Sequence, residues 1–360
     1  MPRDEALSNL RPTVRIRGLE MPVLDRAILA MTAREQVGGL ASLELTLVDW
    51  SSAPDGRAGY AAAGSDNPLK LGAPIEIYCG DVRSPQQIFA GRITALEAES
   101  PRQGPPRITI LAEDALFPAR RIRRRRLFED ASPADIVRAV AQDHGLTPEI
   151  RDGLDAPLAA WAQVDETDLA FLRRVLASVD ADAQAVAQTL QAGPRARDRR
   201  TERELAYPRD LLRVRITADL ARQAAETTAA GFDPLTGEAV SATSADPELG
   251  PGEGRGAADI LAAEFEGWQA HLGDLGALSQ AEADALARAA QGASARGFVT
   301  ADGLAMGDPG IRVGSRVALV GVNPMFENAY CVTSAIHRFD REDGYVTEFI
   351  AECAYLGAGA

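Results

Sequence analysis

Apolar and polar residues alternate with a period of two in both halves of the chain, and this pattern constrains the fold more than any other feature. In the first half it occurs in LELTLVDW (43–50), PIEIYCG (74–80) and RITILAED (107–114). Successive side chains of a β-strand point to opposite faces, so each run predicts a strand with one apolar face. Turn-rich loops at 51–68 and 99–106 separate the runs. Up to about residue 118 we therefore expect an antiparallel sheet that closes into a small barrel.

The same period returns in the second half of the chain. It is found in LLRVRITAD (211–219), RVGSRVALVGV (312–322), AYCVTSAIHRFD (329–340) and GYVTEFIAECAYL (344–356). These runs predict a second barrel. Because a long segment separates the first run from the other three, this barrel is expected to contain an insertion.

Two helices are predicted after the first barrel. Ser132 can accept hydrogen bonds from the first turn of a helix, Pro133 suits its first position, and Gly145 can adopt the left-handed conformation that ends it. A second helix is expected to begin at Asp165 or Thr167, because apolar residues then recur at helical spacing.

The insertion in the second barrel is predicted to be helical at 257–292. Ser279 begins a capping box, in which a serine and an acidic residue three positions later satisfy each other's backbone groups. The apolar residues that recur at helical spacing are Leu261, Phe265, Trp268 and Leu272.

These signals predict an α+β protein that is mostly β, with two tube-type antiparallel β-barrels, a small α/β domain between them and a helical insertion in the second barrel. The arginine-rich segment 194–210 is expected to be a solvated connector. The predicted boundaries are 1–118 for the first barrel, 119–200 for the α/β domain, 201–244 with 296–360 for the second barrel, and 245–295 for the linker and helical insertion.

The charge balance favours a protein partner. Asp and Glu total 52 against 38 Lys and Arg, a net charge of −14 that repels nucleic acids and anionic membranes. Cys79, Cys331 and Cys353 each lie in or beside a predicted strand and are expected to be reduced core residues. No segment approaches the roughly 20 apolar residues that span a bilayer, so synthesis in the cytoplasm without membrane insertion is expected.

Six arginines occupy seven positions at 120–126, in the run RRIRRRR. Their long side chains can cover a barrel surface or pair with carboxylates of a neighbouring chain. Nucleic-acid binding and simple solvated charge are the other interpretations, although the further basic segments and aromatic residues of a nucleic-acid site are not visible nearby. We expect a short ordered link here, with Arg123, Arg124, Arg125 and Arg126 as candidate interface residues.

The sequence predicts no catalytic residue, metal site or cofactor. None of the three histidines lies within four residues of a cysteine or of another histidine, which leaves no metal-ligand spacing. Asp165, Glu166 and Asp168 fit the first turn of a helix, where negative charge opposes the helix dipole. The glycines at 250–256 follow no apolar strand, so a flexible linker is favoured over a phosphate-binding loop.

Five stretches in order, the last of them a long C-terminal segment, resemble the phage late control D family of tail baseplate hub proteins. That family is similar to the N-terminal hub part of the VgrG spike proteins of type VI secretion. The stretches are LKLGAPIEIYCG with IFAGRITALEAE, SPADIVRAVAQDHGL, QVDETDLAFLRRV, AGFDPLTGEAV, and the segment 307–349 that begins GDPGIRVGS.

The resemblance implies a non-enzymatic structural protein. In such a hub two barrels per chain alternate around the axis of a homotrimer, so that six similar domains seat a hexameric tail tube while threefold symmetry seats a trimeric spike. Implied partners are the spike, the tube or tube-initiator protein and other baseplate proteins, within the baseplate of a virion or injection particle. A lumen lined by carboxylates that repels an acidic cargo is also expected.

The resemblance also implies candidate structural or interface residues. They are Asp168, Phe171 and Leu172 in the α/β domain, Gly231, Phe232 and Asp233 in the second barrel, and Gly307, Asp308, Pro309, His337, Asp340, Gly344 and Tyr345 in the closing hairpins. Two departures are expected. Residues 180–200 replace a hairpin of the family, and the chain ends at 360 without a spike, which is then a separate polypeptide.

Two other functions stay open. A tail-tip cell-wall hydrolase needs a cleft with a general acid, and the chain has little spare length for one. A nucleic-acid-binding protein would depend on the arginine run and would bind in a salt-sensitive manner.

Overall fold

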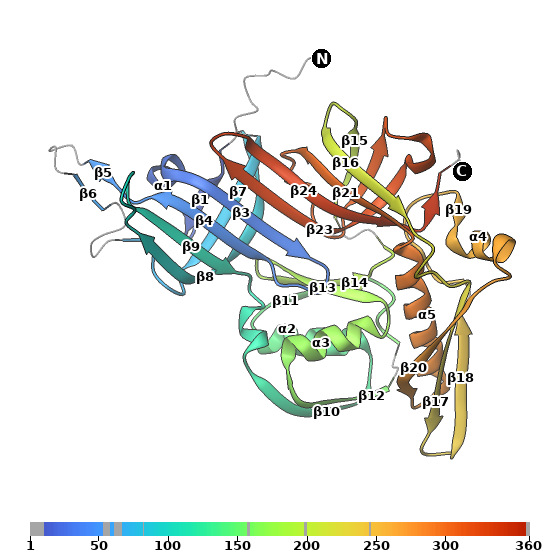
Figure 1. Cartoon of the computed structure of the whole chain (residues 1–360). Helices are drawn as coiled ribbons and strands as arrows, with labels where there is room; N and C mark the ends of the chain where they lie inside the picture. The colour runs from blue at the N-terminus through green and yellow to red at the C-terminus, as the bar shows by residue number, and fades with distance from the viewer. Residues whose placement is uncertain are drawn as a thin grey trace.

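The computed structural model describes residues 11–52, 58–60, 67–81, 83–156, 159–197, 200–244 and 246–357 (Figure 1). A 13-stranded sheet runs through both β-rich parts of the chain. Its strands are β1 (Thr13–Ile16), β2 (Leu19–Glu20), β3 (Ile28–Gln36), β4 (Ser42–Val48), β7 (Pro74–Asp81), β8 (Ser84–Glu99), β9 (Arg107–Glu113), β15 (Glu202–Ala206), β16 (Leu211–Ala218), β21 (Val299–Met306), β22 (Arg316–Val320), β23 (Asn328–Asp340) and β24 (Gly344–Cys353).

The period-two runs form strands whose apolar faces build two cores. On β4, Leu43, Leu45 and Leu47 are buried while Glu44 is exposed, as the alternation predicts. The N-terminal core contains the buried residues of β1, β3, β4, β7, β8 and β9. A second core gathers the buried residues of β21, β22, β23 and β24. The mostly β, α+β class is therefore confirmed.

The two halves of the sheet have the same strand order. The pairing path is β1-β7-β8-β9-β4-β3 in the N-terminal half and β15-β22-β23-β24-β21-β16 in the C-terminal half. If the six strands of each half are ranked along the chain, both paths run first, fourth, fifth, sixth, third, second. One difference is that β1 is antiparallel to β7 whereas β15 is parallel to β22.

A β-bulge occurs at the same place in both halves. The pairing of β8 with β9 shifts register at Thr94, and the pairing of β23 with β24 shifts at Thr333. The Thr94 hydroxyl donates to the carbonyl of Leu111 at 3.3 Å. The Thr333 hydroxyl donates to the carbonyl of Ile350 at 3.2 Å. The repeat therefore extends from strand order to single hydrogen bonds.

A left-handed glycine precedes the fourth strand of each half. Gly72 has φ +79° and Gly314 has φ +81°, a conformation that favours glycine. The amide of Gly72 donates to the carbonyl of Ile93 at 2.7 Å, and that of Gly314 donates to the carbonyl of Val332 at 2.9 Å. These contacts align LKLGAP (69–74) with IRVGSR (311–316), so Arg312 corresponds to Lys70.

The two halves are joined by direct strand pairing. β3 pairs antiparallel with the second part of β23, from Gln36–Ser334 to Ala30–Asp340. Phe339 from β23 is buried in the N-terminal core. Among the described residues no pairing closes either half on itself, and the halves form one continuous sheet instead of two separately closed barrels.

Between the halves in sequence lies a compact α/β unit, drawn in green below the sheet in Figure 1. Its helices α2 and α3 share one core with the strands around them. The elements are η2 (Phe117–Arg120), β10 (Arg123–Ala131), α2 (Pro133–Asp143), β11 (Thr147–Ile150), β12 (Ala159–Thr167), α3 (Asp168–Ala177), β13 (Ala181–Val186) and β14 (Thr189–Pro194).

The helix starts predicted from capping residues are confirmed. Ser132 forms a capping box with Asp135, and Gly145 has φ +67° after α2. Thr167 caps α3 by accepting from the amide of Ala170. Capping is a local interaction between residues a few positions apart, so the helix starts could be predicted from the sequence.

The expected loss of a hairpin at 180–200 is wrong. β13 and β14 pair antiparallel from Ala181–Pro194 to Val186–Thr189. Small alanines replace the larger apolar residues that normally mark such strands, and three of them, Ala181, Ala183 and Ala185, are buried against α3. The prediction of a solvated connector at 194–210 is also wrong. Arg195 forms an ion pair with Glu352, and part of the segment forms β15.

The insertion contains a small sheet as well as helices. Helix α5 (Gln280–Arg296) packs on β17 (Glu226–Asp233), β18 (Glu238–Ser244) and β20 (Gln269–Ala277), and this unit projects from the main sheet (Figure 1). Ser279 caps α5 as predicted. The shorter elements outside it are α1 (Pro22–Ala27), β5 (Ser51–Ser52), β6 (Ala58–Gly59), β19 (Arg255–Gly256), α4 (Ala257–Glu264), η3 (Pro324–Phe326) and β25 (Tyr355–Leu356).

The prediction of continuous helix at 257–292 is wrong in its middle. Helix α4 stops at Glu264, and Glu266 and Gly267 have φ of +59° and +74°. These left-handed residues end the helix, and β20 follows as a strand parallel to β17. Pairing with a strand distant in sequence outweighs the local helical spacing. The expected loop at 51–68 lies largely outside the described residues.

Phe339→Ala tests whether the halves unfold together. The ring is 5% exposed in the N-terminal core although its strand belongs to the C-terminal half. Its removal should cost about 3–5 kcal/mol and shift one common transition, measured by urea unfolding with two optical probes. Phe232→Ala, at 54% exposure, is the control and should change stability by less than about 1 kcal/mol. Separate transitions for the halves would contradict this coupling.

Candidate functional site

A buried carboxylate lies where the two halves meet. Glu35 is on β3, at the seam with β23, and is 7% exposed. The guanidinium of Arg312 donates to it through two nitrogens, Nε to Oε1 and Nη2 to Oε2, both at 2.7 Å. The amide of Val313 also donates to Oε1 at 2.7 Å. This bidentate pair joins an N-terminal strand to the loop that precedes β22.

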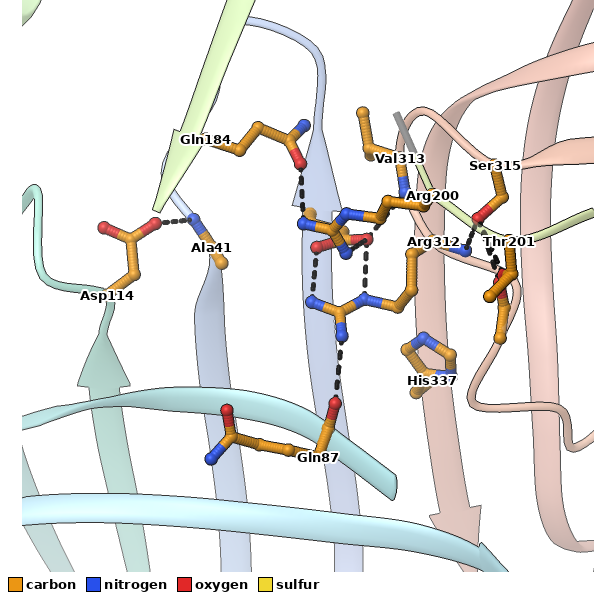
Figure 2. Close-up of polar contacts among 12 residues, drawn as sticks. Ala41, Gln87, Asp114, Gln184, Arg200, Thr201, Arg312, Val313, Ser315 and His337 are labelled. Atoms are coloured by element: carbon orange, nitrogen blue, oxygen red, sulfur yellow. Dashed lines mark hydrogen bonds and ion pairs between the residues drawn. The ribbon is translucent and has the colours of Figure 1, made fainter. Parts of the chain in front are cut away.

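A second arginine extends the contact to the α/β unit. Arg200 lies 3.4 Å from Glu35 and donates to the side-chain oxygen of Gln184 on β13 at 3.1 Å. Arg312 also donates to the carbonyl of Gln87 on β8 at 3.2 Å. Figure 2 shows the two arginines converging between these partners. We call Glu35, Arg200 and Arg312 the junction cluster; it connects both halves of the sheet and the α/β unit.

The charges of the junction cluster are mutually stabilised. Burial disfavours ionisation of Glu35, but Arg200 and Arg312 outweigh it and lower the pKa of Glu35 from 4.5 to about 2. The carboxylate also raises the pKa of Arg312 against the opposing effect of burial. All three groups are therefore charged at neutral pH, and removing one member leaves buried charge without compensation.

His337 and Tyr345 pack beside the junction cluster. Nδ1 of His337 lies 2.8 Å from the Tyr345 hydroxyl and 3.3 Å from the Thr347 hydroxyl. Burial lowers the pKa of His337 to about 3, and the charge of Arg312 acts in the same direction. Burial raises the pKa of the Cys79 thiol well above its ordinary value. The imidazole and the thiol are thus neutral packing groups.

The predicted Gly307, Asp308 and Pro309 lie at the same junction. A Cβ at Gly307 would lie 2.1 Å from the ring of Tyr345, so only glycine fits there. Asp308 accepts from Arg203 Nε at 2.9 Å and from the amide of Gly310 at 2.7 Å. The ring of Pro309 packs against Gly80 of the N-terminal half.

Asp340 and Gly344 form the turn between β23 and β24. The Asp340 carboxylate accepts from the amides of Glu342 and Asp343 at 2.8 and 2.7 Å, and Gly344 has φ +73°. Such an acidic turn start and left-handed glycine close a tight hairpin. The turn presents Tyr345 to the N-terminal core.

The arginine run is a β-strand with two different faces. β10 pairs antiparallel with β12, so the expectation of a short link is corrected. Arg124 and Arg126 point inward and each donates to the fully buried Asp168 at 2.9 Å. His144 lies 3.0 Å from the same carboxylate. The alternate arginines therefore stabilise the α/β unit, an arrangement that period two explains.

The other face of β10 is exposed. The Arg125 side chain is 79% exposed and 3.8 Å from Asp165. Leu127 on β10 and Val164 on β12 are 61% and 70% exposed. Arg123 donates to the carbonyl of Asp165 at 2.5 Å. The outward residues make an exposed, partly apolar surface.

The remaining predicted residues lie apart from the junction. Phe171 is fully buried and stacks on Phe128, with ring centroids 5.7 Å apart, and Leu172 is buried in the same core. Gly231 approaches β20, where a Cβ would lie 2.0 Å from the carbonyl of Ala277. Phe232 is half-exposed beside the β17–β18 turn, where Asp233 accepts backbone amides.

No cofactor site is evident in the part of the chain that the structure describes. There, no group of three or more His, Cys, Asp or Glu side chains is placed to hold a metal ion. No helix of that part is both long and apolar enough to cross a membrane. The three cysteines are free and buried, as predicted.

The sequence prediction missed the junction cluster. Its signal is visible afterwards in ILAMTAREQ, where Glu35 shares the core-facing parity of Met31 and Ala33. An acid on the buried face of a strand requires a charged partner. Arg200 and Arg312 are far from it in sequence, so the sequence could indicate the need for a partner but not its identity.

Comparison with known proteins relates this geometry to tail proteins. The family model described as Alg8 N-terminal domain matches residues 9–341. No curated protein sequence matches the chain.

Three solved structures share the fold along most of the chain. The prophage MuSo2 43 kDa tail protein from Shewanella oneidensis has a TM-score of 0.66 at 10% identity, covering 95% of this chain and 98% of that one. A tail protein from Neisseria meningitidis MC58 has a TM-score of 0.65 at 14% identity, covering 96% of each chain. The type VI secretion component c3393 of E. coli, described as similar to T4 tail proteins gp27 and gp5, has a TM-score of 0.58 at 14% identity, covering 95% and 78%. The resemblance to tail-hub proteins is confirmed as a shared fold.

Glu35→Gln should destabilise the protein by about 3–5 kcal/mol at pH 7, because it leaves the guanidinium of Arg312 buried without a counter-charge. The pKa of Glu35 falls on folding, so its contribution is fully present above pH 4.5 and is lost as pH falls towards about 2. Urea unfolding at pH 7 and pH 3 measures both effects. The exposed Glu44→Gln is the control, and equal pH dependence in wild type and Glu35→Gln would contradict the assignment.

Arg126→Ala should cost about 1.5–3 kcal/mol, because Asp168 loses a charged hydrogen bond while fully buried. Arg125→Ala, at the neighbouring position on the exposed face of β10, should change stability by less than about 0.5 kcal/mol. Thermal unfolding of the two variants compares them directly. Similar losses in both would show that the two faces of β10 are not distinct.

Proposed function

This chain belongs to the Alg8 N-terminal domain family, and we propose that it forms the central hub of a contractile or phage-like tail baseplate. In this proposal three copies assemble into a ring that adapts a sixfold tail tube to a threefold spike. The hub is synthesised in the bacterial cytoplasm and incorporated into the baseplate. It has a mechanical role and no enzymatic one.

The observation that supports this proposal is the internal repeat. Both halves have the strand order first, fourth, fifth, sixth, third, second, with the same threonine bulge and the same left-handed glycine. Two like modules per chain, arranged alternately in a homotrimer, give six like modules around one axis. Closed symmetric rings are the usual form of homo-oligomers.

We propose the division of the chain that the sequence suggested. Residues 1–118 and 201–244 with 296–360 are the two tube-type modules, 119–200 is the α/β domain, and 245–295 is the linker and insertion. In support, separate buried clusters lie in the N-terminal half, the α/β unit and the C-terminal half. A fourth cluster links β17, β18 and β20 to α5, which suggests that the hairpin at 226–244 packs with the insertion.

The junction cluster supports a ring of fixed geometry. A ring closes after three copies only if the angle between the two modules of each chain is constant. Glu35 and Arg312 connect β3 to the C-terminal half by two short hydrogen bonds, while Arg200 connects both to the α/β unit. Charged, bidentate contacts of this kind restrict rotation more than apolar contact does.

The proposed partners are a trimeric spike, the tail tube or its initiator, and other baseplate proteins. Separate surfaces are available for them, including the exposed face of β10 and β12 and the projecting β17–β18 turn, where Leu235 is 94% exposed. Many modest contacts made at once by a closed ring become jointly stable. We further propose that the lumen facing a cargo is lined by carboxylates that repel an acidic cargo, in keeping with the net charge of −14.

The alternatives have less support. The histidine and thiol nearest the junction are buried and neutral, which gives a cell-wall hydrolase no accessible general acid there. Two arginines of the run are engaged by Asp168, which leaves fewer for nucleic acid. Cell-wall digestion and salt-sensitive DNA retention assays test these two functions.

The purified full chain is expected to be a trimer in light scattering and to give ring-shaped particles with threefold symmetry in class-averaged electron images. Six similar densities should alternate around a central hole, because each chain contributes two like modules. A compact monomer at all concentrations and salt conditions would contradict the proposal.

A further inference from the structure

β16 and the end of β8 each have an unpaired edge among the described residues. β16 ends the sheet and pairs only with β21. On β8, pairing with β7 stops at Arg92, so Ala95–Glu99 is paired only with β9. Exposed strand edges offer backbone donors and acceptors to another strand, and soluble proteins usually pair or protect them. Each chain thus offers the edge of β16 and the edge of Ala95–Glu99 to another strand.

The internal repeat relates these edges to a seam that already exists. β16 occupies the place of β3, and β8 occupies the place of β23. Within one chain β3 pairs with the second part of β23. We propose that β16 of one copy pairs antiparallel with Ala95–Glu99 of a second copy, and that this contact is the interface between subunits of the proposed trimer. The inference thus rests on the proposed function and identifies its self-association site.

The repeat also fixes the register of this pairing. β3 and β16 each have a bulge near their start. When these two bulges are aligned, Arg215 of β16 occupies the position that Thr32 has on β3. When the bulges at Thr94 and Thr333 are aligned, Glu99 of β8 occupies the position that Arg338 has on β23. Thr32 lies opposite Arg338 in the seam within the chain. Arg215 of one copy therefore lies opposite Glu99 of the next, and two positions along Thr217 lies opposite Glu97.

The charges of the two edges are complementary in this register. Arg213 and Arg215 are exposed on β16, and Glu97 and Glu99 are exposed on β8. Within the described chain Arg215, Glu97 and Glu99 have no ion-pair partner, and Arg213 has only an exposed contact with Asp302 at 3.7 Å. Opposite charges facing each other across strands stabilise a pair, and like charges destabilise it. A one-residue slip would move each side chain to the other face of the sheet.

The core-facing side of the same edges is apolar. Leu96 on β8 is partly buried against the N-terminal core, and Val214, Ile216 and Ala218 are partly buried against the C-terminal core. Ala218 occupies the place that Glu35 has in the seam within the chain. The subunit seam is therefore apolar inside and ionic outside, which suits contact between separately folded chains.

The geometry of the contact favours a closed ring. Each copy has one β16 and one β8 edge, so the contact is head-to-tail, and such contacts form a ring when the rotation closes. If the subunit seam repeats the rotation of the β3–β23 seam, the six modules are equivalent. Each copy then continues the sheet of its neighbour, and neither edge stays exposed.

Charge reversal tests the register. Arg215→Glu and Glu99→Arg each place like charges opposite one another at every seam of the ring. Each variant should raise the protein concentration at which half of the chains are assembled by at least about tenfold. Light scattering at low salt measures this concentration. The double variant Arg215→Glu with Glu99→Arg restores opposite charges and should assemble like wild type. Arg34→Glu, on the strand that is already paired within the chain, is the matched control and should assemble normally.

Cross-linking gives a readout that does not depend on charge. Thr217→Cys with Glu97→Cys in one chain places two exposed thiols opposite each other across the seam, while the native cysteines are buried. A short thiol-specific cross-linker should then yield covalent trimers, and either cysteine alone should yield none. Circular dichroism checks that every variant is folded.

The outcomes separate this inference from the proposed function. Trimers that persist in both single charge variants, without cross-linking of the cysteine pair, would overturn the β16–β8 interface and leave the hub proposal standing. A wild-type chain that stays monomeric would overturn both. Loss of assembly in each single variant with recovery in the double variant supports the register.

Discussion

The buried ion cluster at Glu35 is the interaction on which the rest of the architecture depends. Glu35 lies on the last part of β3, and its partner Arg312 precedes β22, so the pair fixes the seam between the two halves of the sheet. Arg200 adds the α/β unit to the same contact. Because a buried charge is costly unless it is compensated, the three segments are held in one arrangement. That arrangement is what a hub of fixed symmetry needs.

The internal repeat gives this arrangement its functional meaning. Within the chain, β3 of one module pairs with β23 of the other. The strands at the equivalent positions of the repeat, β16 and β8, each have an edge without a partner strand among the described residues. A chain that pairs one module with the next can continue that pairing to a second copy. One residue distinguishes the seam within the chain from the proposed seam between subunits. The seam within the chain contains the ionised Glu35, and the equivalent position on β16 is Ala218. An apolar edge can be exposed before assembly without the cost of an uncompensated buried charge.

Much of the fold was predictable because its signals are local. Alternation placed the strands, and Ser132, Thr167 and Ser279 placed three helix starts, since a cap depends on neighbours a few residues away. Predictions failed where distant pairing decided the outcome. Residues 269–277 form a strand because β17 lies beside them, and 181–194 form a hairpin of small residues that pairs with the distant β11 and packs against α3. The arginine run was recognised as unusual, but its division into buried and exposed faces follows from pairing with β12.

The sequence by itself determined the mostly β class, the helix starts, the resemblance to tail-hub proteins and the net negative charge, because these follow from residue types and short-range spacing. Only the tertiary structure decided that Glu35, Arg200 and Arg312 meet, that the two halves repeat the same strand order, and that β16 and the end of β8 each keep one edge without a partner strand among the described residues. These facts depend on which distant segments lie side by side. Contacts between residues far apart in the chain leave no periodic trace in the sequence, so their partners become known only from the folded molecule.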